Sequence, residues 1–415
     1  GTGTRQLSRS LEATGEPYPH VKVDMRTGGR PSCAQSDPRA GRWALASGTE
    51  PSSVWRCALG RCLVIALTIA SALAAVLALF GTRGLIGLLA GRGASQPILQ
   101  QNAANERVPP HAHKAGTPTM GGLVILAAAL TGYLLSHVRA GVVFSDQTLI
   151  IIFGVLVMAG LGLIDDLMKV RSHQNRGVYW KLKGLVSYLM AIGIAAVLVT
   201  TTSIDTRISL TRADLPGWDL GPVVWVLWAG TIIFATTNAV NVTDGLDGLA
   251  AGSALFGFIA FTGIAFWALR NPSIYGAVVN PYDLAVLAAA FAGACAGFLW
   301  WNAAPARIFM GDVGALALGS ALALLALATN TQLLLLLICG INVIEAGSVG
   351  LQMAVFRASG RRRRLFKLSP IHHHFEVAGW PETTVIVRFW LISGACVAMA
   401  VAIFVADYTH QVALP

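Results

Sequence analysis

Long apolar runs recur along this chain, and they constrain its fold more than any other feature. Each run of about 20 residues can cross a hydrocarbon layer of roughly 30 Å as a helix. Only 12% of the residues are charged and 55% are hydrophobic, whereas a soluble domain carries roughly 25% charged residues. These values exclude a water-soluble globular domain and a disordered chain. The sequence therefore predicts an all-α polytopic membrane protein.

About ten transmembrane helices are expected, with ends defined to within about 2 to 4 residues. The polar residues 329–332 are interpreted as a turn, because the flanking runs together would be too long for one crossing. Residues 204–210 alternate apolar and polar before Pro216-Gly217, which predicts a short hairpin. The expected spans are 59–80, 117–137, 147–168, 178–200, 222–240, 247–268, 283–301, 313–329, 332–356 and 388–408.

The positions of Lys and Arg predict the orientation, because loops retained in the cytoplasm are enriched in these residues. The connections after odd-numbered spans carry seventeen of them, and the connections after even-numbered spans carry four. Residues 1–58 carry eight more, but long tails are only weakly governed by this rule. Both termini are therefore predicted to be extracytoplasmic. The same interfacial residues explain the net charge of +10 better than nucleic-acid binding does.

Three parts are expected along the chain. Residues 1–58 are rich in Gly, Pro, Ser and Arg without sustained periodicity, which is typical of a disordered tail. Residues 59–410 form the transmembrane domain of ten helices, and 411–415 form a short C-terminal tail. The six cysteines have no CxxC spacing and no paired histidines, so neither a disulfide framework nor a zinc site is expected.

Five aspartates lie at span ends on the predicted cytoplasmic face, where an acidic residue is costly unless it is paired, hydrated or bound to a metal. Helix capping or a solvated interface would explain any one of them alone. Three groups on one face, two of them beside glycine-rich backbone, favour a ligand site instead. Oxygen ligands without His or Cys favour a hard divalent cation such as Mg²⁺, and they also suit Mn²⁺. The groups are Asp165 with Asp166, Asp244 with Asp247, and Asp312.

Basic residues and histidines on the same face would bind phosphate. Lys114 lies in a loop before a glycine-rich helix start, an arrangement that suits anions; an interfacial lysine that reaches toward water is the alternative. His372 to His374 lie in the last cytoplasmic loop. Adjacent histidines rarely converge on one zinc ion, so hydrogen bonding to an anionic substrate is preferred, with a solvated loop as the alternative.

Glu345 falls inside the ninth expected span, near Gly347 and Gly350. A buried carboxylate beside glycines predicts a bent or broken helix. The alternative is a plain helix in which Asn342 or Gln352 is the partner of Glu345.

Five strings in this sequence resemble the bacterial polyprenyl-phosphate N-acetylhexosamine-1-phosphate transferases, in matching order over about residues 59–410. The first and last of them most closely resemble the branch that transfers phospho-N-acetylmuramoyl-pentapeptide. The resemblance implies a homodimeric enzyme of ten helices in the bacterial plasma membrane, with its active site facing the cytoplasm. The strings are HKAGTPTMGG (113–122), LGLIDDLMKV (161–170), NAVNVTDGLDGLA (238–250), FMGDVGALALGS (309–320) and SPIHHHFEVAGWPE (369–382).

The resemblance also implies a reaction and a set of roles. Phospho-N-acetylmuramoyl-pentapeptide would pass from a UDP-linked donor to undecaprenyl phosphate with Mg²⁺, releasing UMP and forming the first lipid-linked peptidoglycan precursor. Asp312 and Asp166 would hold the metal, and Asp165 would deprotonate or orient the lipid phosphate. Lys114 and His373 would complete the catalytic set. The implied substrate-binding residues are Asn238, Asn241, Asp244, Gly245, Leu246, Asp247, Asn302, Phe309, His372 and His374.

Within that set, Gly245, Leu246 and Asp247 would line a uridine pocket, and Phe309 would stack on uracil. The lipid phosphate either attacks the donor directly, or Asp165 attacks first and forms a covalent phosphosugar intermediate. A phosphate monoester with a second pKa of about 6 is largely dianionic at pH 7, so the one-step route is preferred.

Two other functions stay open. One is a sister transferase that uses UDP-N-acetylglucosamine or another UDP-amino sugar. The other is a divalent-cation or organic-anion transporter, which would place acidic residues or broken helices near the bilayer midplane.

Overall fold

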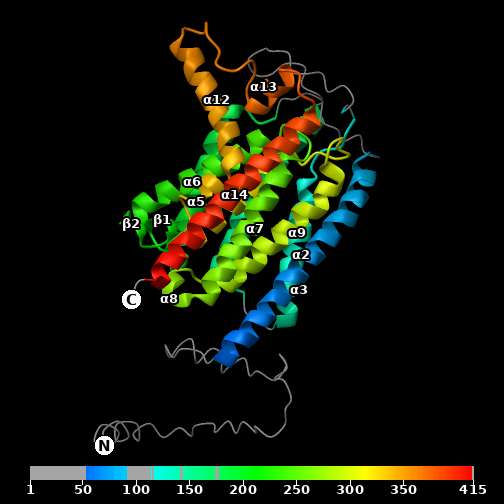
Figure 1. Ribbon diagram of the computed structural model, residues 1–415. Coiled ribbons are helices and arrows are strands. Elements are labelled where there is room, and N and C mark those ends of the chain that lie inside the picture. The colour runs from blue at the N-terminus through cyan, green and yellow to red at the C-terminus, as the bar shows by residue number, and fades with distance from the viewer. Residues whose placement is uncertain (1–52, 91–113, 115, 141–143, 173–176, 414–415) are drawn as a thin grey trace, which may run out of the picture. The chain divides into compact units, whose positions relative to one another are not determined.

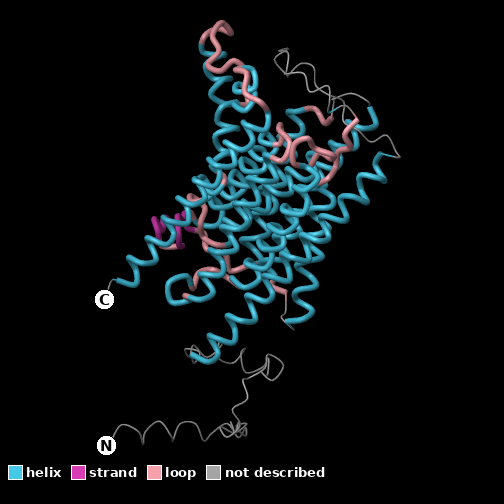
Figure 2. Tube along the Cα trace, turned by 45° about the vertical axis from the view of Figure 1, so that its right-hand side comes forward, coloured by secondary structure: helices cyan, strands magenta, loops and turns pink. Residues whose placement is uncertain are grey.

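The computed structural model describes residues 53–90, 114, 116–140, 144–172 and 177–413. The predicted N-terminal tail lies outside the described residues as far as residue 52. Helices make up most of the described chain (Figures 1 and 2). The helices are α2 (Ser53–Ala90), α3 (Gly122–Ala140), α4 (Asp146–Ser172), α5 (Trp180–Thr201), α6 (Gly221–Thr243), α7 (Leu249–Arg270), α8 (Pro272–Tyr275), α9 (Pro281–Asn302), α10 (Gly311–Ala328), α11 (Leu335–Ile338), α12 (Gly340–Ala358), α13 (Ile371–Val377) and α14 (Glu382–Ala413).

Eight of these helices are long and apolar enough to cross a membrane, namely α2, α4, α5, α6, α7, α9, α10 and α14. A shorter apolar helix covers Gly122–Val138. The chain is therefore a mostly helical, multi-pass membrane protein, as the apolar runs predict. The count of ten helices and the extracytoplasmic position of both termini stay predictions.

Two expected local features are confirmed. Strands β1 (Arg207–Arg212) and β2 (Leu215–Asp219) pair antiparallel and form the hairpin between α5 and α6. The polar segment 329–332 is a turn, because α10 ends at Ala328 and Asn330 has a φ of 55°. The side chains of this turn are buried.

The ninth expected span, 332–356, is two helices rather than one. α11 ends at Ile338 and α12 begins at Gly340. A broken helix is confirmed, but the break at Cys339 lies six residues before Glu345. A Cβ atom at Gly340 would lie 2.7 Å from Sγ of Cys396 on α14. The small residue therefore lets α14 approach the break, and α12 projects away from the bundle (Figure 1).

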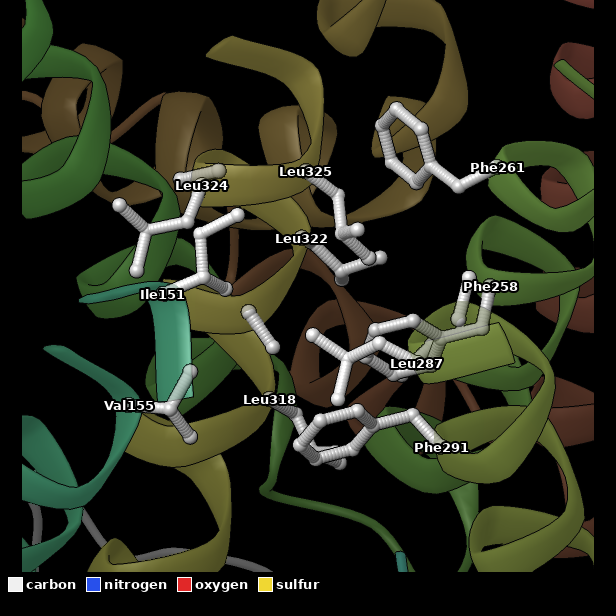
Figure 3. Close-up of a cluster of buried hydrophobic side chains, with 14 of the residues drawn as sticks. Ile151, Val155, Phe258, Phe261, Leu287, Phe291, Leu318, Leu322, Leu324 and Leu325 are labelled. Atoms are coloured by element: carbon white, nitrogen blue, oxygen red, sulfur yellow. The ribbon is translucent and has the colours of Figure 1, made fainter. Parts of the chain in front are cut away.

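α10 lies in the centre of the bundle. Every residue of α10 except Asp312 is buried, and its leucines pack against α4, α7 and α9 (Figure 3). Helices in lipid associate through van der Waals packing at small residues, because lipid tails are as apolar as leucine. A Cβ atom at Gly122 would lie 2.2 Å from Cα of Gly314, and one at Gly162 would lie 2.3 Å from the carbonyl oxygen of Asp312. Glycines thus bring α3 and α4 against the start of α10.

A buried polar cluster joins α3, α4 and α9 at the opposite end of the bundle from Asp312. Asp283 accepts hydrogen bonds from the Tyr133 hydroxyl at 3.1 Å and from the Ser145 N–H at 2.7 Å. Its Oδ1 atom lies 2.5 Å from Nε2 of His137. Nδ1 of His137 faces the carbonyl oxygen of Tyr133 at 2.9 Å. Both ring nitrogens of His137 therefore face oxygen acceptors, and the carboxylate ties three segments together.

Replacing Asp283 by alanine should destabilise the fold by about 3 to 5 kcal/mol, because one partner of a buried charged pair is left without the other. Thermal unfolding of the purified protein in detergent measures this change. Asp146→Ala is the matched control, since Asp146 is exposed at the start of α4. We expect that variant to change stability by no more than about 0.5 kcal/mol. Equal unfolding temperatures for the two variants would contradict the structural role of Asp283.

Candidate active site

Three carboxylates from α4 and α10 form one cluster at the end of the bundle where α10 begins. Asp165 and Asp166 lie near the end of α4, and Asp312 lies in the first turn of α10. One ligand atom from each residue lies within 4.8 Å of the others. The side chains of Asp165 and Asp166 are 3% and 1% exposed, whereas that of Asp312 is 15% exposed. Asp312 is therefore the most accessible of the three.

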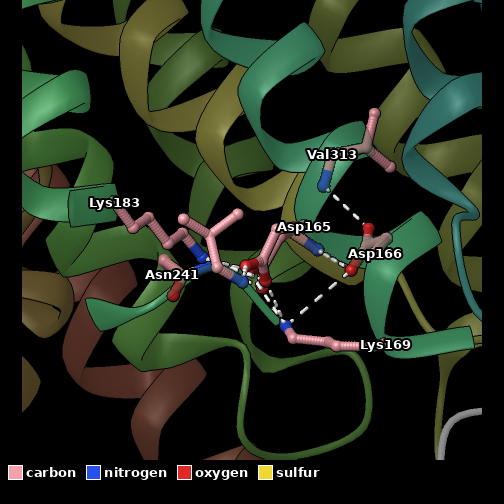
Figure 4. A network of polar contacts seen from close by, with 8 residues as sticks. Asp165, Asp166, Lys169, Lys183, Asn241 and Val313 are labelled. Atoms are coloured by element: carbon pink, nitrogen blue, oxygen red, sulfur yellow. Dashed lines mark hydrogen bonds and ion pairs between the residues drawn. The ribbon is translucent and has the colours of Figure 1, made fainter. Parts of the chain in front are cut away.

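Asp166 anchors the start of α10. Its Oδ1 accepts the N–H of Asp312 at 3.1 Å, and its Oδ2 accepts the N–H of Val313 at 3.0 Å (Figure 4). The first N–H groups of a helix have no partner within that helix, and the helix dipole favours a negative charge there. Gly311, with a φ of 74°, precedes these two residues. No side chain of α10 itself caps its start, so Asp166 supplies the cap and holds Asp312 in place.

Two lysines lie among these carboxylates. Nζ of Lys169 lies 2.7 Å from Oδ2 of Asp165 and 3.0 Å from Oδ2 of Asp312. Nζ of Lys183 on α5 lies 3.3 Å from Oδ2 of Asp165 and also contacts Oδ2 of Asp312. The two ammonium groups therefore bridge Asp165 and Asp312 and compensate their charge.

The sequence reasoning counted both lysines for orientation only and missed them as site residues. Lys169 follows Asp165 by four residues, and such pairs share one helix face, so a local signal was available. Lys183 lies on the next helix, where nothing in the local sequence indicates its distant partner.

Two further contacts hold the carboxylates from outside α4 and α10. The Val178 N–H donates to Oδ1 of Asp165 at 2.7 Å. Nδ2 of Asn241 on α6 donates to Oδ1 of Asp312 at 3.0 Å. The predicted site residue Asn238 instead donates to the carbonyl oxygen of Phe234 on its own helix, at 2.8 Å. Of the two asparagines, only Asn241 contacts the carboxylate cluster.

Lys114 is part of a second charged group at the same end of the bundle. Its Nζ lies 2.8 Å from Oδ1 of Asp247 and 2.5 Å from Oε1 of Glu382, the first residue of α14. Glu382 also accepts the N–H of Asp247 at 3.2 Å, and the Ala306 N–H donates to Oδ2 of Asp247 at 2.9 Å. Lys114 is only 8% exposed. The alternative of a lysine that reaches toward water is therefore wrong, and Glu382 is a further contact that the sequence reasoning missed.

The segment between α6 and α7 carries three more predicted residues. Asp244 follows the last residue of α6, and burial together with the nearby charge of Asp312 raises its pKa well above the ordinary value of an aspartate. Leu246 is buried in an apolar cluster with residues of α14. A Cβ atom at Gly245 would lie 2.5 Å from Nε2 of His372. The lack of a side chain at residue 245 thus allows the histidine to approach this segment.

The three consecutive histidines of α13 have three different surroundings. Nδ1 of His372 lies 2.9 Å from Oε2 of Glu345, and both side chains are buried. Nδ1 of His373 lies 2.6 Å from Oε2 of Glu376, and Nδ1 of His374 accepts the Lys367 N–H at 3.0 Å. Only His372 faces Gly245. The partner of Glu345 is thus His372, and the alternative of a plain helix with Asn342 or Gln352 as its partner is wrong.

Asn302 ends α9, and Phe309 lies on the connection between α9 and α10. Asn302 is buried and donates from Nδ2 to the carbonyl oxygen of Ile308 at 2.9 Å. This hydrogen bond joins the end of α9 to the connection before α10. The backbone of Phe309 pairs with the motif around Lys114, because its N–H donates to Pro118 at 2.8 Å and its carbonyl accepts the Gly121 N–H at 2.9 Å. The five strings singled out in the sequence therefore meet at one end of the bundle.

Comparison with known families gives the class of this multi-pass helical protein. Residues 148–330 match the family model of glycosyl transferase family 4. Residues 114–126 match signature 1 of the phospho-N-acetylmuramoyl-pentapeptide transferases. The chain is thus a membrane-bound enzyme of the glycosyl transferase family 4 class.

Similar proteins show which family within this class the chain belongs to. Relatives in Frankia alni and Rhodococcus jostii are 43% and 42% identical over 82% of this chain and 97% of their own length. A relative in Streptomyces griseus is 40% identical over 82% of this chain and 98% of its own length. All three are named phospho-N-acetylmuramoyl-pentapeptide-transferase. This chain belongs to the phospho-N-acetylmuramoyl-pentapeptide-transferase family.

Gly311→Ala should lower transferase activity by about 100-fold, because displacing a reacting group by roughly 1 Å costs that much. Residue 311 has a φ of 74°, and its Cβ atom would lie 2.5 Å from Oδ2 of Asp166. Initial rates of membrane-extracted enzyme measure the effect. Gly347→Ala is the control, since a Cβ atom there would meet nothing within 4 Å. Full activity of Gly311→Ala would show that the Asp166 contact does not position Asp312.

Proposed function

We propose that this enzyme transfers phospho-N-acetylmuramoyl-pentapeptide from its UDP-linked donor to undecaprenyl phosphate, releasing UMP and forming the first lipid-linked peptidoglycan precursor (lipid I). The observation that carries the proposal is the cluster of three carboxylates with Lys169 and Lys183. A pyrophosphate donor and a phosphate acceptor together bring several negative charges into the site. Two ammonium groups supply part of the compensation, and we propose that they bind phosphate oxygens.

The carboxylate cluster fits a hard divalent cation. Its ligand atoms are oxygens only and lie within 4.8 Å of one another, and Mg²⁺ is commonly held by one or two carboxylates together with substrate phosphates. Asp312 and Asp166 are the proposed ligands, with Asp312 the more accessible. When bound, Mg²⁺ would stabilise negative charge on the phosphates and on the leaving UMP. Mn²⁺ suits the same oxygens.

Buried polar atoms without a partner support the binding of a polar substrate at this end of the bundle. Among the described residues they include Oγ1 of Thr119, Oδ1 of Asn302, Oε1 of Glu345 and Nε2 of His372. Such atoms are rare in native proteins, so this end of the bundle has unused hydrogen-bonding capacity. His372 faces Gly245, which the resemblance assigns to the uridine pocket together with Leu246 and Asp247.

Further substrate contacts are proposed from the resemblance and fit the observed surroundings. Lys114 would bind phosphate or sugar, held in place by Asp247 and Glu382. Phe309 would stack on uracil, and Asn238, Asn241 and Asp244 would complete the donor site. His373 and His374 would contact the sugar or phosphates.

The proposed setting is the bacterial plasma membrane with this end of the bundle facing the cytoplasm. The excess of Lys and Arg in the connections at this end supports that orientation. A homodimer is proposed on the resemblance alone. The position of the carboxylates at helix ends favours the transferase over a transporter, which would place them near the bilayer midplane.

Release of UMP tests the proposed reaction. Purified enzyme in detergent with undecaprenyl phosphate and Mg²⁺ should release UMP from UDP-N-acetylmuramoyl-pentapeptide and not from UDP-N-acetylglucosamine. Asp312→Asn should lower this rate by about 100-fold or more, because it removes a negative charge that would hold the divalent cation and that pairs with Lys169 and Lys183. Asp146→Asn, an exposed change on α4, should leave it unchanged.

Other outcomes of the UMP-release assay would contradict parts of this proposal. Release only from UDP-N-acetylglucosamine would move the enzyme to the sister group. Absence of release from both donors by well-folded protein would favour the transporter. Activity that survives EDTA would contradict the divalent-cation requirement.

We propose the one-step course, in which the lipid phosphate attacks the donor directly and Asp165 positions the acceptor. Oδ1 of Asp165 accepts the Val178 N–H, and its Oδ2 contacts both lysines. A carboxylate surrounded by an N–H group and two ammonium groups is a weak nucleophile, because these contacts stabilise its charge.

Intact-mass spectrometry distinguishes the two courses. The mass of the protein should not change on incubation with the UDP-linked donor and Mg²⁺ when the lipid acceptor is left out. Asp165→Asn is the control, since it cannot form an acyl phosphate at residue 165. A gain equal to the phosphosugar in the unchanged enzyme, absent from this variant, would establish the two-step course instead.

A further inference from the structure

A helical arm extends from the bundle beside the candidate active site. It consists of α12 and of the segment that returns from the end of α12 to α13, and we call residues 340–372 the α12 arm. α12 projects away from the bundle (Figure 1). The return segment leads the chain back to His372, which faces Gly245. The α12 arm is therefore joined to the active-site end of the bundle, while its far end lies outside the packed core.

The polar side chains of α12 face the return segment. Glu345, Ser348 and Gln352 lie on one side of the helix, because residues three and four apart are neighbours, and all three are buried. Each of them binds a group of the return segment and satisfies polar groups that lipid could not. The polar side of the arm is therefore closed. The contacts are Glu345 with Nδ1 of His372 at 2.9 Å, Ser348 with the Ile371 N–H at 2.9 Å, and Gln352 with the N–H groups of Leu365 and Phe366 at 3.0 and 2.9 Å.

The outward side of α12 is apolar instead. Val343, Ile344, Leu351 and Met353 are between 40% and 51% exposed. A surface helix of a water-soluble protein has the opposite arrangement, with its apolar side chains toward the core and its polar side chains in water. An amphipathic helix at a membrane surface buries its apolar side in the lipid. The α12 arm therefore presents a surface suited to lipid rather than to water.

The tip of the arm, residues 357–367, is strongly cationic. Residues 346–375 contain six Lys and Arg residues and no Asp or Glu, and all six basic residues are exposed at the tip. Five of them have no side-chain partner in the part of the chain that the structure describes. Exposed cations gathered at one place without compensation attract anions. The five are Arg357, Arg361, Arg362, Arg363 and Lys367.

We propose that the tip of the α12 arm binds the anionic headgroups of phospholipids in the leaflet on the side of the active site. The apolar side of α12 lies against the lipid, and headgroups are the anions at the surface of that lipid. A cluster of about four to eight basic residues on an amphipathic helix is typical of binding to an anionic membrane surface. The inference does not rest on the proposed reaction, because it needs only the membrane setting of the chain.

Lipid titration followed by native mass spectrometry tests the proposal on the full chain in a neutral detergent. The unchanged protein should bind dihexanoyl phosphatidylglycerol about tenfold more tightly than dihexanoyl phosphatidylcholine, because only the first lipid carries a net negative charge. The combined variant Arg361→Gln, Arg362→Gln and Arg363→Gln should lower this preference to about twofold or less, since each lost cation weakens the attraction. Thermal unfolding checks that the variant is folded.

A matched control removes the same number of charges outside the tip. Arg83→Gln, Lys181→Gln and Arg270→Gln together replace three exposed cations that lie on three different helices. We expect this variant to keep the tenfold preference to within about twofold, because isolated cations do not form a cluster.

Two further measurements identify the interaction as electrostatic. Lysine in place of Arg361, Arg362 and Arg363 keeps the charge and should keep the preference. Ammonium acetate at about 1 M shortens the screening length to roughly 3 Å, so the preference of the unchanged protein should fall at least threefold.

Four results would overturn the proposal. The first is equal binding of the two lipids by the unchanged protein. The second is an undiminished preference in the glutamine variant of the tip, and the third is an equal loss of preference in the control variant. The fourth is displacement of phosphatidylglycerol by an equimolar amount of undecaprenyl phosphate, which would identify a lipid monophosphate as the ligand of the tip.

Discussion

The contact between the Asp166 carboxylate and the first turn of α10 is the interaction on which the rest of the site depends. It joins α4 to the central helix, because both oxygens accept backbone N–H groups that the helix cannot satisfy itself. A buried carboxylate is costly in a membrane protein unless such partners are present. Gly162 and Gly311 allow the approach, since a Cβ atom at either position would collide with the partner segment. The same contact fixes Asp312 beside Lys169, Lys183 and Asn241.

The polar interactions of the bundle are concentrated at its two ends. Between them, α10 is packed by leucines and small residues (Figure 3), and such packing is not driven by the hydrophobic effect in lipid. Buried polar clusters at the helix ends add directional contacts that the apolar centre lacks. Asp283 ties α3, α4 and α9 at one end, and Asp166 ties α4 to α10 at the other. The apolar centre therefore does little to determine which helices pack together. The polar contacts at the two ends determine which helices are neighbours.

Features that depend on neighbouring residues could be predicted from the sequence, and features that depend on distant partners could not. Apolar length predicts the helices, and alternation with Pro216-Gly217 predicts the hairpin. The acidic strings on one predicted face do meet in space. The break expected beside Glu345 lies at Cys339 instead, where Gly340 packs closely against Cys396 on α14. Glu382 and Lys183 were missed for the same reason: Lys114 and Glu382 are 268 residues apart, and no local pattern reports such a pair.

The three clustered aspartates have different freedom to bind a ligand, although their chemistry is the same. Both oxygens of Asp166 hold the backbone of α10, so Asp166 has the least freedom to move toward a ligand. Asp165 has more freedom than Asp166, because a backbone N–H group fixes one of its oxygens while the lysines contact the other. Asp312 is contacted by the side chains of Asn241, Lys169 and Lys183, and side chains can turn to a substrate at less cost than backbone can. Exchange of partners at this site is therefore easiest at Asp312, and the two aspartates of α4 supply the rigid frame against which that exchange takes place.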